Sequence, residues 1–147
     1  MVKICTSIEQ SKKLLELGLS PKSADMYYRY VLPHSDKLHH VPNIGEPTNA
    51  LSWYNKGYTL GGKNKPMTLE EFCIPCWSLG ALLDVLKTRK DCNFITIHSS
   101  YSLKWILNTS YYELANWKEK ETVEETLIDT VYNMIVWLLK NGYIEKE

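Results

Sequence analysis

The segment that most restricts the fold lies near the C-terminus, where apolar residues recur with the period of an amphipathic helix. Thr122 and Glu125 form a capping-box pattern before this segment, and Gly142 is placed to end the helix. Such a stripe becomes stable mainly by packing, so the rest of the chain must supply a surface that covers it. The stripe consists of Leu127, Val131, Met134, Ile135 and Leu138.

The N-terminal part of the chain has a second helical pattern. Thr6 and Glu9 form a capping-box pattern, and Gly18 is placed to take the left-handed conformation that often ends a helix. Ser20 and Pro21 then fit an N-cap followed by proline at the first helical position, which predicts one short helical turn. The apolar stripe of the first helix consists of Ile8, Leu14, Leu15 and Leu17.

Helical signals return after residue 67. Thr68 and Glu71 form another capping-box pattern, which predicts a short helix from Leu69 until Pro75 interrupts it. A new helix is expected to begin near Ser78, because apolar residues follow at i, i+3, i+4 and i+7. These residues are Leu79, Leu82, Leu83 and Leu86.

Four runs have the composition of β-strands. Residues 26–31 are rich in aromatic and β-branched side chains, and the other runs cover residues 93–98, 102–107 and 111–117. Short connections between the last three favour an antiparallel meander. The sequence therefore predicts a single α+β domain over residues 1–147. We expect two layers, with an antiparallel sheet of three to five strands packed against two or three helices.

Residues 32–66 are punctuated by proline and glycine and carry no sustained period. Short strands at residues 51–54 and 58–60 could flank a turn at residues 55–57. Because a long structureless loop is unusual inside a compact domain, we expect an ordered excursion or a hairpin.

Composition limits the function classes. The 147 residues contain 17 basic and 17 acidic side chains, whereas a dedicated DNA-binding domain usually has a basic excess. The N-terminus lacks the apolar stretch of a signal peptide, and the longest apolar run, residues 134–139, is far shorter than a membrane span of about 20 residues. We therefore expect a cytoplasmic protein with reduced thiols and no membrane partner.

One motif invites a catalytic interpretation, the C-x-x-C of Cys73 and Cys76. Such a pair at a helix start can exchange disulfides. However, Glu70 and Glu71 precede it and disfavour a thiolate, and no proline after Pro75 can supply the loop that faces the cysteines in thioredoxin-like folds. Two buried core thiols are the simpler interpretation.

The sequence predicts neither a metal site nor a cofactor. Tetrahedral zinc needs two further ligands close to the C-x-x-C, but Cys5 and Cys92 are isolated in the sequence. No nucleophile, base and acid occur in a recognisable catalytic pattern either, which favours a non-enzymatic protein.

An aromatic and basic segment within the excursion is the candidate binding surface. Rings and positive charges alternate there with no acid between them, a combination that fits a protein partner and, less well, single-stranded nucleic acid. Two alternatives are that the protein forms a homo-oligomer and that these rings pack into the core rather than onto a partner. The candidate residues are Trp53, Tyr54, Lys56, Tyr58, Lys63 and Lys65.

The last sequence feature is a set of five segments, residues 5–19, 24–28, 74–79, 129–134 and 137–139. Together these segments resemble a group of small uncharacterised proteins from prophage-like and mobile regions of gut bacterial genomes. No activity is attached to that group, so the resemblance implies no catalytic residue. It implies a phage-like origin, and it also implies that the second cysteine of the C-x-x-C is often replaced by alanine.

These observations lead to two functional hypotheses. The first is a non-enzymatic accessory or interaction domain that binds a macromolecular partner, most simply a protein, through residues 53–65. The alternative is a thiol–disulfide oxidoreductase that uses Cys73 and Cys76.

Overall fold

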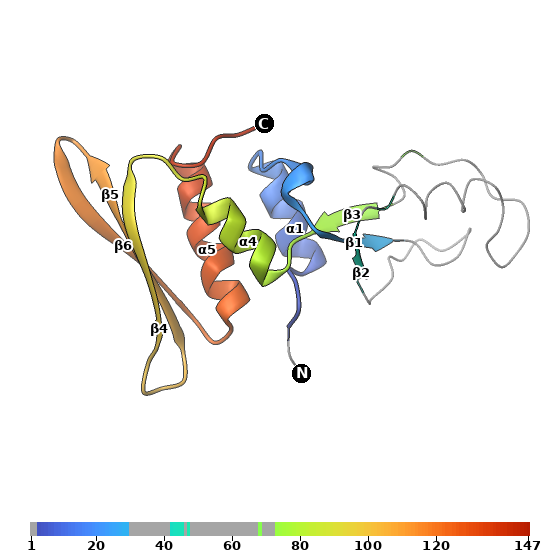
Figure 1. Ribbon diagram of the computed structural model, residues 1–147, viewed down its shortest axis with the longest axis horizontal. Helices are drawn as coiled ribbons and strands as arrows, with labels where there is room; N and C mark the ends of the chain where they lie inside the picture. The colour runs from blue at the N-terminus through green and yellow to red at the C-terminus, as the bar shows by residue number, and fades with distance from the viewer. Residues whose placement is uncertain (1–2, 30–41, 46, 48–67, 69–72) are drawn as a thin grey trace, which may run out of the picture.

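A computed structural model describes residues 3–29, 42–45, 47, 68 and 73–147 (Figure 1). Its helices are α1 (Ile8–Glu16), α4 (Leu79–Leu86) and α5 (Leu127–Lys140), with a 3-10 turn, η1, at Pro21–Ser23. The described strands form two antiparallel three-stranded sheets. The predicted α+β class is confirmed, with its strands divided between two sheets.

The first sheet is small and has the order β2-β1-β3. Its strands are β1 (Met26–Arg29), β2 (Asn43–Ile44) and β3 (Cys73–Cys76). The short helix predicted from Leu69 to Pro75 is wrong at its end, where β3 lies, and its start at residues 69–72 is outside the described residues. An edge strand accommodates Pro75, because the proline lacks only an N–H that an edge can leave unpaired, whereas a helix interior cannot.

The second sheet is the predicted antiparallel meander, with the order β4-β5-β6. Its strands are β4 (Cys92–Ser99), β5 (Trp105–Glu113) and β6 (Asn116–Glu124). Residues 111–117, predicted as one strand, instead contain the turn of the β5–β6 hairpin. Leu114 and Ala115 form this turn with φ angles of 51° and 64°, and no glycine or asparagine between the strands signals it.

The helices lie between the two sheets (Figure 1). α5 packs on β5 and β6, α4 packs on α5, and α1 contacts β3. The largest hydrophobic cluster joins all three helices to the central strand β5 and includes Leu14, Leu82, Leu107, Val131 and Leu138, each fully buried. The predicted stripe of α5 therefore finds its cover in α4 on one side and in the second sheet on the other.

Two helix starts differ from the predictions. Ser7, not Thr6, caps α1, and its capping box closes with the Gln10 side chain. Thr126, not Thr122, caps α5. Thr122 belongs to β6, and its hydroxyl donates to the carbonyl of Thr130 in α5. In both cases a neighbouring hydroxyl residue has the extended backbone and the geometry that capping requires.

Four further helix signals are confirmed. Ser78 caps α4, Ser20 precedes η1 with Pro21 at its start, and Gly142 follows α5 with a φ of 78°. Gly18 has a φ of 96° after α1, and the next amide donates to the Leu14 carbonyl at 3.0 Å. Among the described residues, no helix is both long and apolar enough to span a bilayer.

Candidate interaction surface

The two faces of the second sheet have different environments. On the inner face, Leu107 and Thr109 of β5 are fully buried, and the ring of Tyr111 lies 4.8 Å from that of Trp137 in α5. Lys120 of β6 also points inward, with its Nζ 5.6 Å from the centre of the Trp137 ring. These contacts establish which alternate residues of β5 and β6 face the helices.

The outer face is formed by the intervening residues and is covered by none of the described helices (Figure 1). β5 contributes Ile106, Asn108, Ser110 and Tyr112 by strand alternation. Tyr112 pairs with Trp117 across the hairpin, and their ring centres are 5.3 Å apart. An antiparallel sheet can leave one face in water, but such a face is usually polar, whereas this one carries exposed aromatic rings.

A β-bulge interrupts the ladder on this face. Cys92 pairs with Tyr111 and Ile95 pairs with Thr109, so Asn93 and Phe94 together oppose the single residue Ser110. The hydroxyl of Thr109 donates to the carbonyl of Phe94 at 3.2 Å, which holds the bulge in place. Bulges of this kind change the direction of a side chain and are common beside functional sites.

A hollow of about 240 Å³ lies at the bulge. Ser110 is one of the residues that line it and is only 7% exposed, and its Oγ is buried with no hydrogen-bond partner among the described residues. The flanking rings of Phe94 and Trp117 are 52% and 57% exposed. A buried hydroxyl without a partner is uncommon in proteins, because it loses its hydrogen bonds to water. The hollow is lined by Asn93, Phe94, Ser110, Trp117, Lys118 and Glu119.

The charge of the outer face is negative along β6. Trp117, Glu119, Glu121 and Val123 alternate with the inward residues of this strand. None of the described ion pairs involves Glu119 or Glu121. The same alternation directs the side chain of Lys118 away from the outer face, as the contact of Lys120 with α5 shows for its neighbour.

A larger depression, of about 640 Å³, lies between η1 and α4, and none of the buried unpartnered polar atoms among the described residues lines it. Ser23 Oγ accepts from the Trp77 indole at 2.9 Å, and Asp25 accepts from the amide and the hydroxyl of Ser78. The depression therefore offers no buried polar atom without a hydrogen-bond partner that a ligand could satisfy.

The C-x-x-C cysteines lie in β3, where they are buried, with Cys73 6% and Cys76 0% exposed. Positions three apart in a strand point to opposite faces, and their Cα atoms are about 10 Å apart. A disulfide needs Cα atoms closer than about 7 Å. Burial raises the pKa of Cys73 to about 11, and the pKa of Cys76 is also raised. This geometry disfavours disulfide exchange between the two.

The neighbour of Cys76 is instead Cys5, from the N-terminal arm. The two thiols belong to the same small buried cluster, and their interaction lowers the pKa of Cys5 to about 6 against the opposing effect of its burial. Cys5 Sγ also lies 3.3 Å from the hydroxyl of Tyr28, which donates to the Thr6 carbonyl at 2.9 Å. The sequence gives no sign of this cluster, because antiparallel pairing of the arm with Ser78 creates it.

The predicted partner-binding residues all lie outside the described residues, and so do the predicted strands at 51–54 and 58–60. The outer face of the second sheet was missed by sequence reasoning. The available signal was the presence of aromatic residues at Phe94, Tyr112 and Trp117 within predicted strands. Without the register of the strands, however, the sequence could not show which face of the sheet each ring occupies. Within the described part of the chain, no three His, Cys, Asp or Glu side chains are grouped as metal ligands.

Comparisons with known proteins do not assign the chain to a family. No family model matches it, and no match was found among the curated proteins or the solved structures. The functional argument therefore depends on the geometry of the surface.

Proposed function

We propose that this protein is an interaction domain that binds a segment of a partner protein on the outer face of the β4–β5–β6 sheet. The observation that supports this most is the hollow at the bulge, where a buried, unpartnered hydroxyl lies between two exposed aromatic rings. Tyrosine and tryptophan are enriched at protein interfaces, since they offer a large apolar surface together with a polar group.

The chemistry of the face favours a protein over a nucleic acid. Glu119 and Glu121 line the same side of β6, and their carboxylates would repel phosphates. Exposed aromatic rings next to unpaired polar groups match the mixed apolar and polar character of a protein interface. A second surface at residues 53–65, and a phage-like origin, stay predictions of the sequence. The thiol–disulfide alternative is not favoured, because Cys73 and Cys76 face opposite sides of β3.

A peptide-display selection on the immobilised, intact protein tests this proposal. Peptides enriched on the wild-type protein are re-measured against Trp117→Ala, which removes an exposed ring without touching the core. Tyr101→Ala is the matched control, because Tyr101 is also an exposed aromatic residue but lies in the β4–β5 connection. We expect peptides whose binding falls at least tenfold in Trp117→Ala, and stays unchanged in Tyr101→Ala.

Two results would contradict the proposal. One is a set of selected peptides that binds both variants equally well. The other is a homodimer in sedimentation velocity that Trp117→Ala dissociates, since the face would then be occupied by a second copy of the chain. Thermal melts of both variants check that the fold is retained.

A further inference from the structure

We infer that the hollow at the bulge is a subsite for one arginine side chain of the partner segment. This inference rests on the proposed function and names the chemistry that the outer face recognises. Its basis is the combination of aromatic walls, an unpartnered acceptor at the base and a free carboxylate at the rim.

The walls fit the stem and the plane of an arginine. Phe94 and Trp117 flank the hollow, and about half of each side chain is exposed to solvent. An arginine side chain can bury its methylene groups along such apolar surfaces and can stack its guanidinium on an aromatic ring. Lysine fits less well, because its ammonium group is a strongly hydrated point charge that does not stack.

The base of the hollow needs a hydrogen-bond partner. Ser110 Oγ is buried without one, and a guanidinium carries five donors and no acceptor. Ser110 Oγ has almost no solvent-accessible surface, so a guanidinium N–H reaches it only when the exposed side chains beside it shift. The contact would then restore a hydrogen bond that the folded chain leaves unmade. An apolar ligand would fill the same volume without making this hydrogen bond, so it would gain less binding free energy.

The outward charge at the hollow is the carboxylate of Glu119, because Lys118, which also lines the hollow, directs its side chain to the other face of β6. Glu119 lines the hollow, and it makes no ion pair with any residue that the structure describes. Glu121, the next outward residue of β6, lies on the same face but does not line the hollow. A carboxylate and a guanidinium form charge-assisted hydrogen bonds, which are about twice as strong as neutral ones. The bulge contributes by interrupting the ladder at Ser110, which opens the space that the side chain would fill.

The test uses the intact, ¹⁵N-labelled protein and N-acetyl-L-arginine methylamide as the probe, followed by NMR. We expect shifts of the Trp117 indole and of the amides of residues 93, 94, 110 and 119, with a Kd on the order of 1–10 mM, as for other very small ligands. The citrulline analogue has nearly the same shape without the charge, and it should bind at least tenfold more weakly. Equal binding of the two would overturn the inference.

Variants separate the subsite from a general charge effect. Glu119→Gln should weaken the arginine probe by roughly tenfold, as expected for the loss of one charge-assisted hydrogen bond. Glu121→Gln is the matched control, since it removes the same charge from the same strand face outside the hollow, and it should change the Kd less than twofold. Equal losses in the two variants would contradict the subsite.

Ser110→Ala distinguishes a binding role of the hydroxyl from a purely structural one, because a structural role alone would not change the affinity for the arginine probe. Removing an unsatisfied buried hydroxyl should leave the melting temperature unchanged or higher, while the arginine probe binds several times more weakly. A variant that melts lower and binds the probe as well as the wild type would contradict the role of Ser110.

The peptide selection distinguishes this inference from the proposed function. Trp117-dependent peptides that contain arginine, and lose binding when it is replaced by citrulline, support both. Trp117-dependent peptides without arginine would refute the subsite and leave the interaction domain standing. If no Trp117-dependent peptide emerges, the proposed function fails, whereas the arginine titration still decides the subsite.

Discussion

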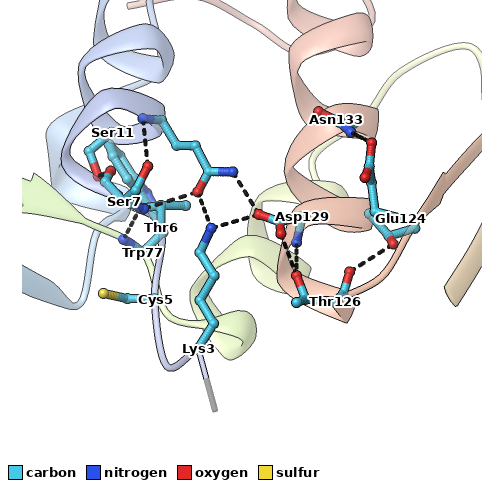
Figure 2. A network of polar contacts seen from close by, with 12 residues as sticks. Lys3, Cys5, Thr6, Ser7, Ser11, Trp77, Glu124, Thr126, Asp129 and Asn133 are labelled. Atoms are coloured by element: carbon cyan, nitrogen blue, oxygen red, sulfur yellow. Dashed lines mark hydrogen bonds and ion pairs between the residues drawn. The ribbon is translucent and has the colours of Figure 1, made fainter. Parts of the chain in front are cut away.

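Asp129 shows how one side chain holds together parts of the chain that are far apart in sequence. Its Oδ1 accepts from Lys3 Nζ at 2.6 Å and from Gln10 Nε2 at 2.7 Å, and its Oδ2 accepts from the Thr126 hydroxyl at 2.6 Å (Figure 2). Asp129 also lies in the first turn of α5, where a negative charge interacts favourably with the helix dipole. The N-terminal arm, α1 and α5 therefore meet at one carboxylate.

Replacing Asp129 by asparagine should destabilise the protein by about 1–2 kcal/mol at neutral pH, because charge-assisted hydrogen bonds are lost. Urea denaturation followed by circular dichroism measures this change. Asp84→Asn is the control, since Asp84 makes only an exposed ion pair with Lys87, 3.3 Å away, and such pairs contribute little. Equal stability changes in the two variants would refute the special role of Asp129.

The same carboxylate predicts a pH dependence. Burial disfavours its charge, but the hydrogen bonds from Lys3, Thr126 and Gln10 outweigh this effect and lower the pKa of Asp129. A lowered pKa means that the ionised form is more stable in the folded protein than in the unfolded chain. The stability from Asp129 is thus fully present at neutral pH and is lost as the pH falls below about 4. Asp129→Asn should show a smaller loss of stability over that range.

At the scale of elements, the β5–β6 hairpin is the clearest case in which the backbone preference of the residues conflicts with the conformation that the fold requires. Its two-residue turn places Leu114 and Ala115 at positive φ angles, which residues other than glycine, asparagine and aspartate rarely adopt. The pairing of Glu113 with Asn116 nevertheless keeps both strands in register with the inner residues on α5. Long-range packing therefore determines this turn against the preference of its own residues.

The double substitution Leu114→Asn with Ala115→Gly should stabilise the protein by about 1–2 kcal/mol, because this pair suits a turn with two positive φ angles. The melting temperature measures the change. Leu103→Asn, at another exposed position with a positive φ of 61°, is a useful comparison outside the hairpin and should raise stability by a smaller amount. A lower melting temperature for the double variant would show that the turn has a different conformation.

The helices were largely predictable, and the reasons are local. The stripes that contain Leu82 and Val131, and the stop at Gly142, depend on residues within a few turns of one another. The helix starts were displaced by one residue at Ser7 and by four at Thr126, since several hydroxyl residues compete for each cap. β3 was missed, because its pairing partner, β1, lies more than forty residues away.

At the scale of the whole molecule, stability is concentrated in one cluster. The main core joins α1, α4 and α5 to Leu107 of the second sheet, whereas Cys5, Met26, Tyr28 and Cys76 form a separate small cluster beside the first sheet. The outer face of the second sheet takes no part in either cluster. A binding surface there can change without loss of the fold.

Leu138→Ala should therefore cost about 2–5 kcal/mol, because it opens a cavity in the main core. Ile44→Ala, at an exposed position of β2, should cost less than about 0.5 kcal/mol. Denaturant titration of both variants checks the contrast. Comparable losses would show that the first sheet contributes as much to stability as the helical core.

The sequence by itself determined α1, α4, α5 and the α+β class, because each depends on local periodicity, and it indicated an antiparallel meander without the correct bounds of its strands. The tertiary structure alone decided which strand face meets α5 and which stays open. A strand presents alternate residues to opposite sides, so Ser110 and Glu119 become neighbours only through the register of β4, β5 and β6. Cys73 and Cys76 are only three positions apart in the sequence, but they lie on opposite faces of β3 because successive residues of a strand alternate between its faces.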